Sequence, residues 1–220
     1  MNTGTWWWNM QKKLDEQRPG ATIIPVIISI DKTQVTLFCD KTAYPVYLTI
    51  RNIPKEIQRK PSQRAHVLLA YLPTSHLEHI DNRASCHRSA ANLYHACMAR
   101  VLSPLKNAGL DGLAMRSGDG ISCHCHPLFA CFIGNYPEQV LAAAVKTTEC
   151  PTCDIPANEL ESSTTPFEIH DLNTVLDALA MIDIGGLNFI QACRDAGIKP
   201  IVHPFWKRLQ CLSPRDGNSP

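Results

Sequence analysis

Apolar residues gather in short runs along the first third of the chain, and these runs predict a β-sheet. The longest run, rich in isoleucine and valine, lies between Pro19-Gly20 and Asp31, as expected of a buried strand bounded by turns. The next two runs follow after connections too short for a crossover, so we expect an antiparallel meander of three strands. Pro45 near the start of the third run predicts an edge strand, because proline cannot donate to a ladder. The four expected strands, the last ended by Pro73, cover residues 22–30, 34–39, 44–50 and 66–72.

The pattern then changes to the three-to-four-residue period of a helix. Apolar residues recur on one face between residues 85 and 103, and Pro104 with Gly109 predicts the end of this helix. That face is interpreted as core, formed by Ala90, Leu93, Tyr94, Cys97, Met98, Val101 and Leu102. A further buried strand is expected at 128–134, and further helices at about 137–146, 171–182 and 187–196.

Capping residues support the later helices. Asn135 lies three residues before Glu138, which is the spacing of a capping box. Asp171 is the expected N-cap of the next helix, and Gly197 is the expected left-handed residue that ends the last one.

Three meandering strands, a short strand, a helix, a strand and a helix predict an α/β fold with a mixed sheet. This order is expected of an RNase H-like core, in which one acid lies on the first strand and a second lies beside it, at the end of the fourth. The remaining helices predict a helical C-terminal part. We divide the chain into a polar N-terminal lead (1–20), a partial core (21–147), a helical insertion (148–206) and a tail (207–220).

Asp31 is the first candidate functional residue, because it follows the buried strand directly. A carboxylate in an apolar setting is unfavourable unless it is paired or holds a metal ion. Two interpretations stay open: Asp31 opens the turn into the next strand, since Asp favours turns, or it is a metal ligand.

Composition narrows the class of protein. The chain has 220 residues, a net charge of +1 and ten cysteines, and this length allows a domain with a real core. The N-terminus lacks the basic-then-apolar pattern of a secretory signal, and no apolar stretch is long enough to span a membrane. We therefore expect an intracellular, reducing compartment. The nearly neutral charge leaves any DNA affinity to local patches such as Arg59, Lys60 and Arg64.

Two cysteines have the spacing of a metal site. Cys150 and Cys153 are separated by two residues, which lets both thiolates bind one Zn²⁺. One pair is half of a site. Cys193 and His203 are the best candidates for the other half, because both lie after the pair and in or beside segments that resemble a known family, as described below. We expect a structural zinc site here, with two unliganded thiols or a redox pair as alternatives. Weaker candidate ligands are Asp154 and His170.

A second cluster of the same residue types occupies positions 123–126, Cys-His-Cys-His. Because alternate residues of a strand point to opposite faces, only Cys123 with Cys125, or His124 with His126, could share a site.

Several longer motifs, spread over most of the chain, together resemble those of one known protein family. They are 20–27 (GATIIPVI) with 31–34 (DKTQ), 43–57 (AYPVYLTIRNIPKEI), 126–128 (HPL) with 136–139 (YPEQ), 149–153 (ECPTC), and 196–206 from AGIKP to HPFW. In this order, from about residue 6 to residue 206, they resemble the Plavaka-type transposases of fungal DNA transposons.

The resemblance implies a DDE-type transposase core, in which two or three carboxylates hold two Mg²⁺ ions for in-line attack on a DNA phosphate. Asp31 matches the family's first acid. The second acid lies where this chain has Asn135, and the third is expected beyond residue 220. The resemblance also implies DNA as the partner and the nucleus as the compartment.

Asn135 changes the expected chemistry. An asparagine offers one neutral carbonyl oxygen where aspartate offers a charged carboxylate, and Mg²⁺ prefers anionic oxygen ligands. We therefore predict that Mg²⁺ is not bound productively and that the chain is a transposase-derived, catalytically inactive fragment. Asn135 can still cap the helix that follows it, so the fold is expected to be retained.

Two other functions remain open. One is a non-enzymatic DNA- or protein-binding module that retains the zinc site. The other is a small metal-dependent nuclease that pairs Asp31 with Asp119 or Glu138. The sequence carries no signal for the oligomeric state.

Overall fold

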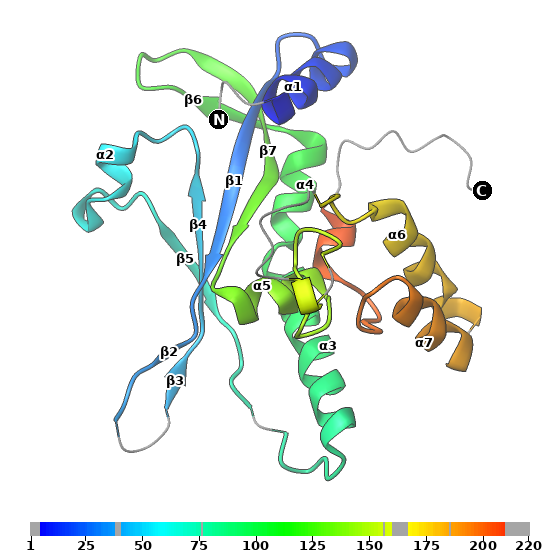
Figure 1. The fold of residues 1–220 in the computed structure, drawn as a ribbon. Helices are drawn as coiled ribbons and strands as arrows, with labels where there is room; N and C mark the ends of the chain where they lie inside the picture. Colours follow the sequence, from blue (N-terminus) through cyan, green and yellow to red (C-terminus); the bar gives the residue numbers. More distant parts are fainter. Residues whose placement is uncertain are drawn as a thin grey trace.

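The computed structural model is organised around a curled, five-stranded mixed sheet with the order β5-β4-β1-β7-β6 (Figure 1). The central strand β1 (Thr22–Ile30) pairs antiparallel with β4 (Pro45–Ile50) and parallel with β7 (Ser122–Ile133). The edges are β5 (Val67–Tyr71) and β6 (Leu113–Arg116). The structure describes residues 5–37, 41–75, 77–155, 157–159, 167–184 and 186–209.

Helices cover one face of this sheet. In Figure 1, α3, α4 and α5 lie along that face, and α6 and α7 lie farther out, beyond α5. The α-helices of the described residues are α1 (Thr5–Gln17), α2 (Lys55–Gln58), α3 (Arg83–Val101), α4 (Ser103–Asp111), α5 (Tyr136–Ala143), α6 (Leu172–Ala180) and α7 (Gly186–Asp195). None of them is long and apolar enough to cross a membrane.

The expected mixed α/β fold is confirmed, but the meander differs in its second strand. The strand predicted at 34–39 is not part of the main sheet, and residues 38–40 lie outside the described ranges. In the described part of this stretch, β2 (Thr33–Gln34) forms, and it pairs with β3 (Thr42–Ala43) in a small separate hairpin. The antiparallel meander is therefore β1-β4-β5. The edge position expected from Pro45 is wrong, because β4 lies between two strands; proline is tolerated as the first residue of the strand.

Two features were not expected from the sequence. Strand β7 begins at Ser122, six residues before the predicted start, and pairs with β6 as an antiparallel hairpin. The helix expected to end near Pro104 is instead followed by α4, which holds Pro104 in its first turn, where its missing N–H is not needed. Gly112, with a φ of 78°, ends α4.

The polar N-terminal lead forms a helix, α1, that is anchored to the start of β1. The Gln11 side-chain amide donates to the Ala21 carbonyl (2.8 Å) and accepts from the Ile23 N–H (3.1 Å). Leu14, 1% exposed, packs against Ile23 and Leu128. One apolar residue and one amide thus fix a helix that is otherwise exposed.

The C-terminal helices agree with the predicted caps. Asp171 accepts from the backbone N–H groups of Asn173 and Thr174 at the start of α6. Gly197, with a φ of 72°, follows α7. Helices α5, α6 and α7 share their own apolar cluster, which contains Val140, Leu179 and Cys193.

The main core lies between the sheet and α3, and an irregularity in β7 helps to form it. Val26 is opposite Phe129 whereas Ile27 is opposite Cys131, so Ala130 is an extra residue on β7. In a regular strand, Phe129 and Phe132 would point to opposite faces. The bulge lets both rings contact Phe205, with centroid distances of 6.2 and 6.5 Å.

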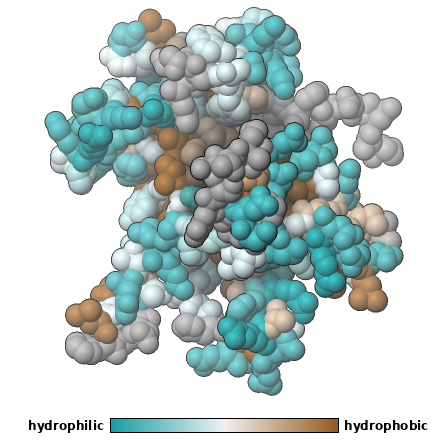
Figure 2. All heavy atoms as spheres, viewed as in Figure 1, coloured by the Kyte–Doolittle hydropathy of each residue, from teal (hydrophilic) through white to brown (hydrophobic). Residues whose placement is uncertain are grey.

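Most of the surface seen in Figure 2 is hydrophilic. Exposed apolar groups gather at the tip of the β2–β3 hairpin, where Val35 and Leu37 are 65% and 87% exposed. Edge strand β5 is also exposed over most of its length.

Candidate functional site

The candidate site begins where β1 and β7 end side by side. Because these strands are parallel and Ser29 is opposite Ile133, residues 31 and 135 leave the sheet at the same level. A Cβ built on Gly134 would lie 3.6 Å from the Ile30 carbonyl oxygen, so the segments that follow β1 and β7 lie close together there. The structure thus brings Asp31 and Asn135 to neighbouring positions at the carboxyl ends of adjacent strands.

Asp31 itself is exposed, one residue beyond the end of β1. The Thr33 hydroxyl lies 3.4 Å from both its Oδ2 and its carbonyl oxygen, a long turn-type contact. Asp31 is therefore not a buried charge that needs a partner. Its contact with Thr33 is that of a turn residue, and its carboxylate is open to solvent.

Asn135 is at the N-cap position of α5, as expected, but it does not act through its side chain. Its backbone is extended (φ −71°, ψ 172°), and its amide makes no capping hydrogen bond. The predicted capping box is wrong, because Glu138 points into the protein and is only 6% exposed. Among the described residues, Glu138 Oε2 has no hydrogen-bond partner.

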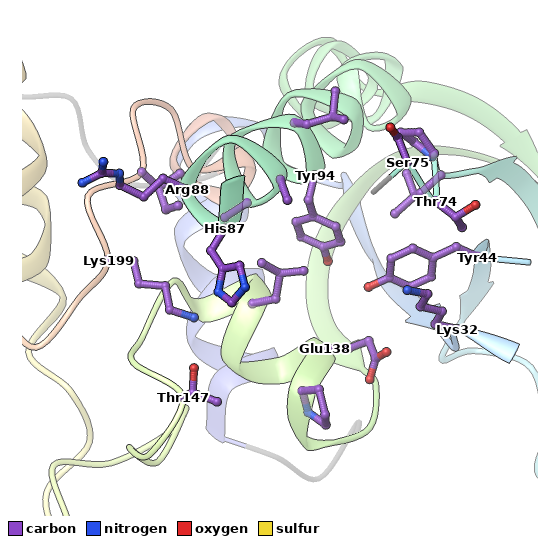
Figure 3. A pocket seen from close by; sticks show the side chains of 18 of the residues that line it. Lys32, Tyr44, Thr74, Ser75, His87, Arg88, Tyr94, Glu138, Thr147 and Lys199 are labelled. Carbon is purple, nitrogen blue, oxygen red and sulfur yellow. The ribbon is translucent and has the colours of Figure 1, made fainter. Parts of the chain in front are cut away.

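A cavity of about 550 Å³ opens beside the two strand ends. Lys32 follows Asp31, and Pro137 with Glu138 follows Asn135, so both strand ends contribute directly to its wall. Figure 3 shows the hydroxyl groups of Tyr44 and Tyr94 directed into this space with Glu138 below them. The other polar lining residues are Thr74, Ser75, His87, Arg88, Thr147 and Lys199.

Burial dominates the electrostatics of this cavity. Burial, with the neighbouring charge of Glu138, raises the pKa of Tyr44 well above its usual value. The pKa of Tyr94 is also raised, first by burial and then by Tyr44 and Glu138. Both phenols therefore stay protonated at neutral pH, as hydrogen-bond donors. Burial lowers the pKa of Lys199.

His95 ties the elements behind this cavity together. Its Nε2 lies 3.0 Å from the Leu141 carbonyl oxygen, and its Nδ1 lies 3.4 Å from the Phe205 N–H. This pattern needs the neutral ring with the proton on Nε2. Burial lowers the pKa of His95 to about 4. The hydrogen bond to Leu141 raises this pKa, and the nearby charge of Lys199 lowers it further.

The four predicted zinc ligands are not brought together. The Sγ atoms of Cys150 and Cys153 lie 3.3 Å apart, so that pair is formed. Cys193 is fully buried in the apolar cluster of α5, α6 and α7, and His203 is exposed in a surface pocket along α3. Across the described ranges, no group of three or more His, Cys, Asp or Glu side chains is arranged to hold a metal ion.

The weaker candidate ligands have other partners. His170 Nε2 lies 2.9 Å from the Cys150 carbonyl oxygen, and Asp154 accepts from the Glu168 N–H. Burial raises the pKa of the Cys150 thiol, but hydrogen bonds from the Thr152 N–H and from Cys153 together outweigh it, so the pKa is lowered overall.

One of the two alternative nuclease acids, Asp119, is separated from Asp31 by the length of β7. Asp119 lies in the β6–β7 turn, hydrogen-bonded to Ser117 and to the Ile121 N–H. The twelve residues of β7 lie between it and Asn135, a distance of roughly 40 Å along a strand. Asp119 is therefore at the opposite end of the sheet from Asp31, whereas Glu138 is at the same end but faces the cavity.

The alternation predicted for residues 123–126 is observed. The rings of His124 and His126 lie on the same side, with centroids 5.0 Å apart. Each bonds a carbonyl oxygen of α4: His124 that of Asp111 and His126 that of Gly109. These histidines fasten the α4 end to β7.

The sequence did not single out this cavity, because its lining comes from six separated segments. By sequence, Tyr94 belongs to the core stripe and Glu138 to a helix cap. Only the burial of Glu138 in the first turn of α5, where solvent is expected, distinguishes it, and that burial is a property of the fold.

Comparisons with known proteins give one result. A family model described as Plavaka transposase matches residues 1–220. Neither the curated proteins nor the solved structures contain a match. Because the family model covers the whole chain, this protein belongs to the Plavaka transposase family.

Proposed function

We propose that this protein is a transposase-derived, RNase H-like core that contacts DNA in the nucleus without cutting it. The observation that carries the proposal is that Asp31 and Asn135 follow the ends of the adjacent parallel strands β1 and β7. A two-metal centre needs carboxylates from both positions, and this chain supplies one.

The order of the sheet supports the RNase H-like assignment. β1, β4 and β5 form an antiparallel meander, α3 follows, and β7 returns parallel to β1. Such a core places its first two acids at the ends of neighbouring strands, which is the relation between residues 31 and 135.

Asp31 and Asn135 fit Mg²⁺ poorly. One exposed carboxylate and one amide oxygen leave most of the coordination shell of each ion to water. With one charge missing, the pair does not neutralise two divalent cations held close together. Asp31 would hold at most one hydrated ion, and within the described ranges no group of three or more His, Cys, Asp or Glu side chains is arranged to complete a metal centre.

A nicking assay on supercoiled DNA with Mg²⁺ or Mn²⁺ tests the proposal. We expect the wild-type protein and the Asp31→Ala variant to give the same background of nicked product. Metal-dependent nicking by the wild type that Asp31→Ala abolishes would show an active nuclease and overturn it.

Contact with DNA is tested separately by a gel shift at increasing salt. We expect binding that weakens steeply between about 50 and 200 mM salt, because phosphate contacts release counterions. No binding at the lower salt concentration would remove DNA as the partner and favour a protein-binding module.

A further inference from the structure

We propose that the cavity beside the ends of β1 and β7 binds a single unstacked nucleotide whose base carries an amino group. This inference rests on the proposed contact with DNA, and it names a site that the two-metal chemistry does not require.

The strongest indication lies deep in the cavity. Glu138 is 6% exposed and Tyr94 is 5% exposed. Glu138 Oε2 and the Tyr94 hydroxyl have no hydrogen-bond partner among the described residues. Buried polar atoms are nearly always hydrogen-bonded in native proteins, and each exception calls for an explanation. A ligand that donates to the carboxylate and accepts from the phenol satisfies both atoms.

The chemistry of this end fits the edge of a nucleobase. A carboxylate accepts from an exocyclic amino group such as N4 of cytosine, and a ring nitrogen or carbonyl beside it can accept from the tyrosine. The rings of Tyr44 and Tyr94 lie 6.2 Å apart at 28°, and Leu72, Pro137 and Leu141 supply apolar walls. Enzymes that take up an unstacked base combine hydrogen bonds to its edge with aromatic or apolar stacking in the same way.

The other end of the cavity suits a phosphate. Lys199 and His87 line it, and Figure 3 shows both side chains directed into the space from the side opposite Tyr44. Arg88, whose guanidinium bonds the Ser85 hydroxyl, adds positive charge at the rim. A cavity of about 550 Å³ is in the range of small-molecule sites, so a mononucleotide fits and a duplex does not.

The test uses purified wild-type protein and free deoxynucleotides, followed by calorimetry. We expect saturable binding of dCMP. We expect 2-deoxyribose 5-phosphate, which lacks the base, and dTMP, which has a carbonyl where cytosine has its amino group, to bind about tenfold more weakly. Inorganic phosphate reports the phosphate end alone.

Two variants divide the site into its ends. Glu138→Gln should weaken dCMP about tenfold and leave deoxyribose phosphate unchanged. Lys199→Ala should weaken both ligands by a similar factor. Lys13→Ala, on the exposed face of α1 and away from the cavity, is the matched control and should change neither. Circular dichroism verifies that each variant is folded.

The proposal is overturned if dCMP shows no saturable binding, if deoxyribose phosphate or inorganic phosphate binds as tightly as dCMP, or if folded Glu138→Gln binds dCMP like the wild type. Because the ligands are free nucleotides, these outcomes are independent of the gel shift. Binding of dCMP without duplex binding would sustain the pocket and reject the proposed DNA contact.

Discussion

Asp31 and Asn135 show how much a single side chain decides at the ends of two parallel strands. Both residues follow the ends of adjacent parallel strands, and both side chains are exposed. Asn135 makes no capping hydrogen bond, so the α5 helix does not depend on its amide. The missing charge is therefore a change of chemistry with little structural consequence.

This independence allows a direct prediction. Asn135→Asp should create a pair of neighbouring carboxylates and tighten Mn²⁺ binding at least about tenfold, because divalent cations prefer anionic oxygen. Calorimetric titration with Mn²⁺ measures the change.

The controls are Asn135→Ala and the double variant Asp31→Ala/Asn135→Asp, neither of which should gain affinity. If Asn135→Asp binds Mn²⁺ no better than Asn135→Ala, then the two positions are not close enough to share an ion.

At the scale of single elements, α1 illustrates a helix held by very few contacts. It carries two exposed tryptophans, Trp6 and Trp8, and buries only Leu14. Its polar composition gives no apolar stripe to recognise, so the sequence indicates only a polar lead and no helix.

Leu14→Ala should therefore loosen α1 and lower the free energy of unfolding by about 2–5 kcal/mol, the usual range for a buried leucine. Urea denaturation measures it. Glu16→Ala, at an exposed position of the same helix, should stay within about 0.5 kcal/mol of the wild type. Equal effects of the two changes would mean that Leu14 does not anchor the helix.

The Cys150 loop is the element in which a zinc ion remains a prediction. Zinc bound at this pair would be lost in both Cys150→Ser and Cys153→Ser, since these two thiols lie together. Cys193→Ala should keep the zinc, because Cys193 lies in the apolar cluster of α5, α6 and α7. Elemental analysis measures the zinc content of the wild type and of each variant. Wild-type protein free of zinc would reject the site.

For the whole molecule, acid should act through His95, which joins α3 to the end of α5 and to Phe205. The pKa of His95 is about 4 in the folded protein and about 6.5 in an unfolded chain. The unfolded chain takes up the proton first as the pH falls. The stabilising difference is therefore complete above pH 6.5 and is lost between pH 6.5 and 4, by up to about 1.4 kcal/mol per pH unit.

Urea midpoints at pH 7.5, 6 and 5 test this dependence. His95→Gln is expected to be less stable overall but to lose most of the slope with pH. His66→Gln, an exposed control, should keep it. An unchanged slope in His95→Gln would assign the acid sensitivity to other groups.

The sequence was informative wherever one period or one cap determined an element. The β1 run and the Asp171 cap describe local choices, and the structure agrees with them. The α3 stripe is confirmed at Tyr94, Met98 and Leu102, but Ala90 and Leu93 are exposed, and Ala91 and His95 are buried instead. Partners distant in the chain were not predictable. The strand predicted at 34–39 lost its place in the sheet because β1 pairs directly with β4. Family motifs located Asp31 and position 135, whereas the cavity beside them depends on tertiary packing.

The extra residue in β7 has a consequence for how related chains should be compared. Ala130 resets the alternation of the strand between His126, which faces α4, and the end of β7 that leads to position 135 beside β1. Removing this one residue would turn one of the two ends to the opposite side of the sheet, whatever its amino acids. The spacing between these positions is thus a structural requirement in its own right, and a one-residue insertion or deletion there would disrupt the site while leaving every motif intact.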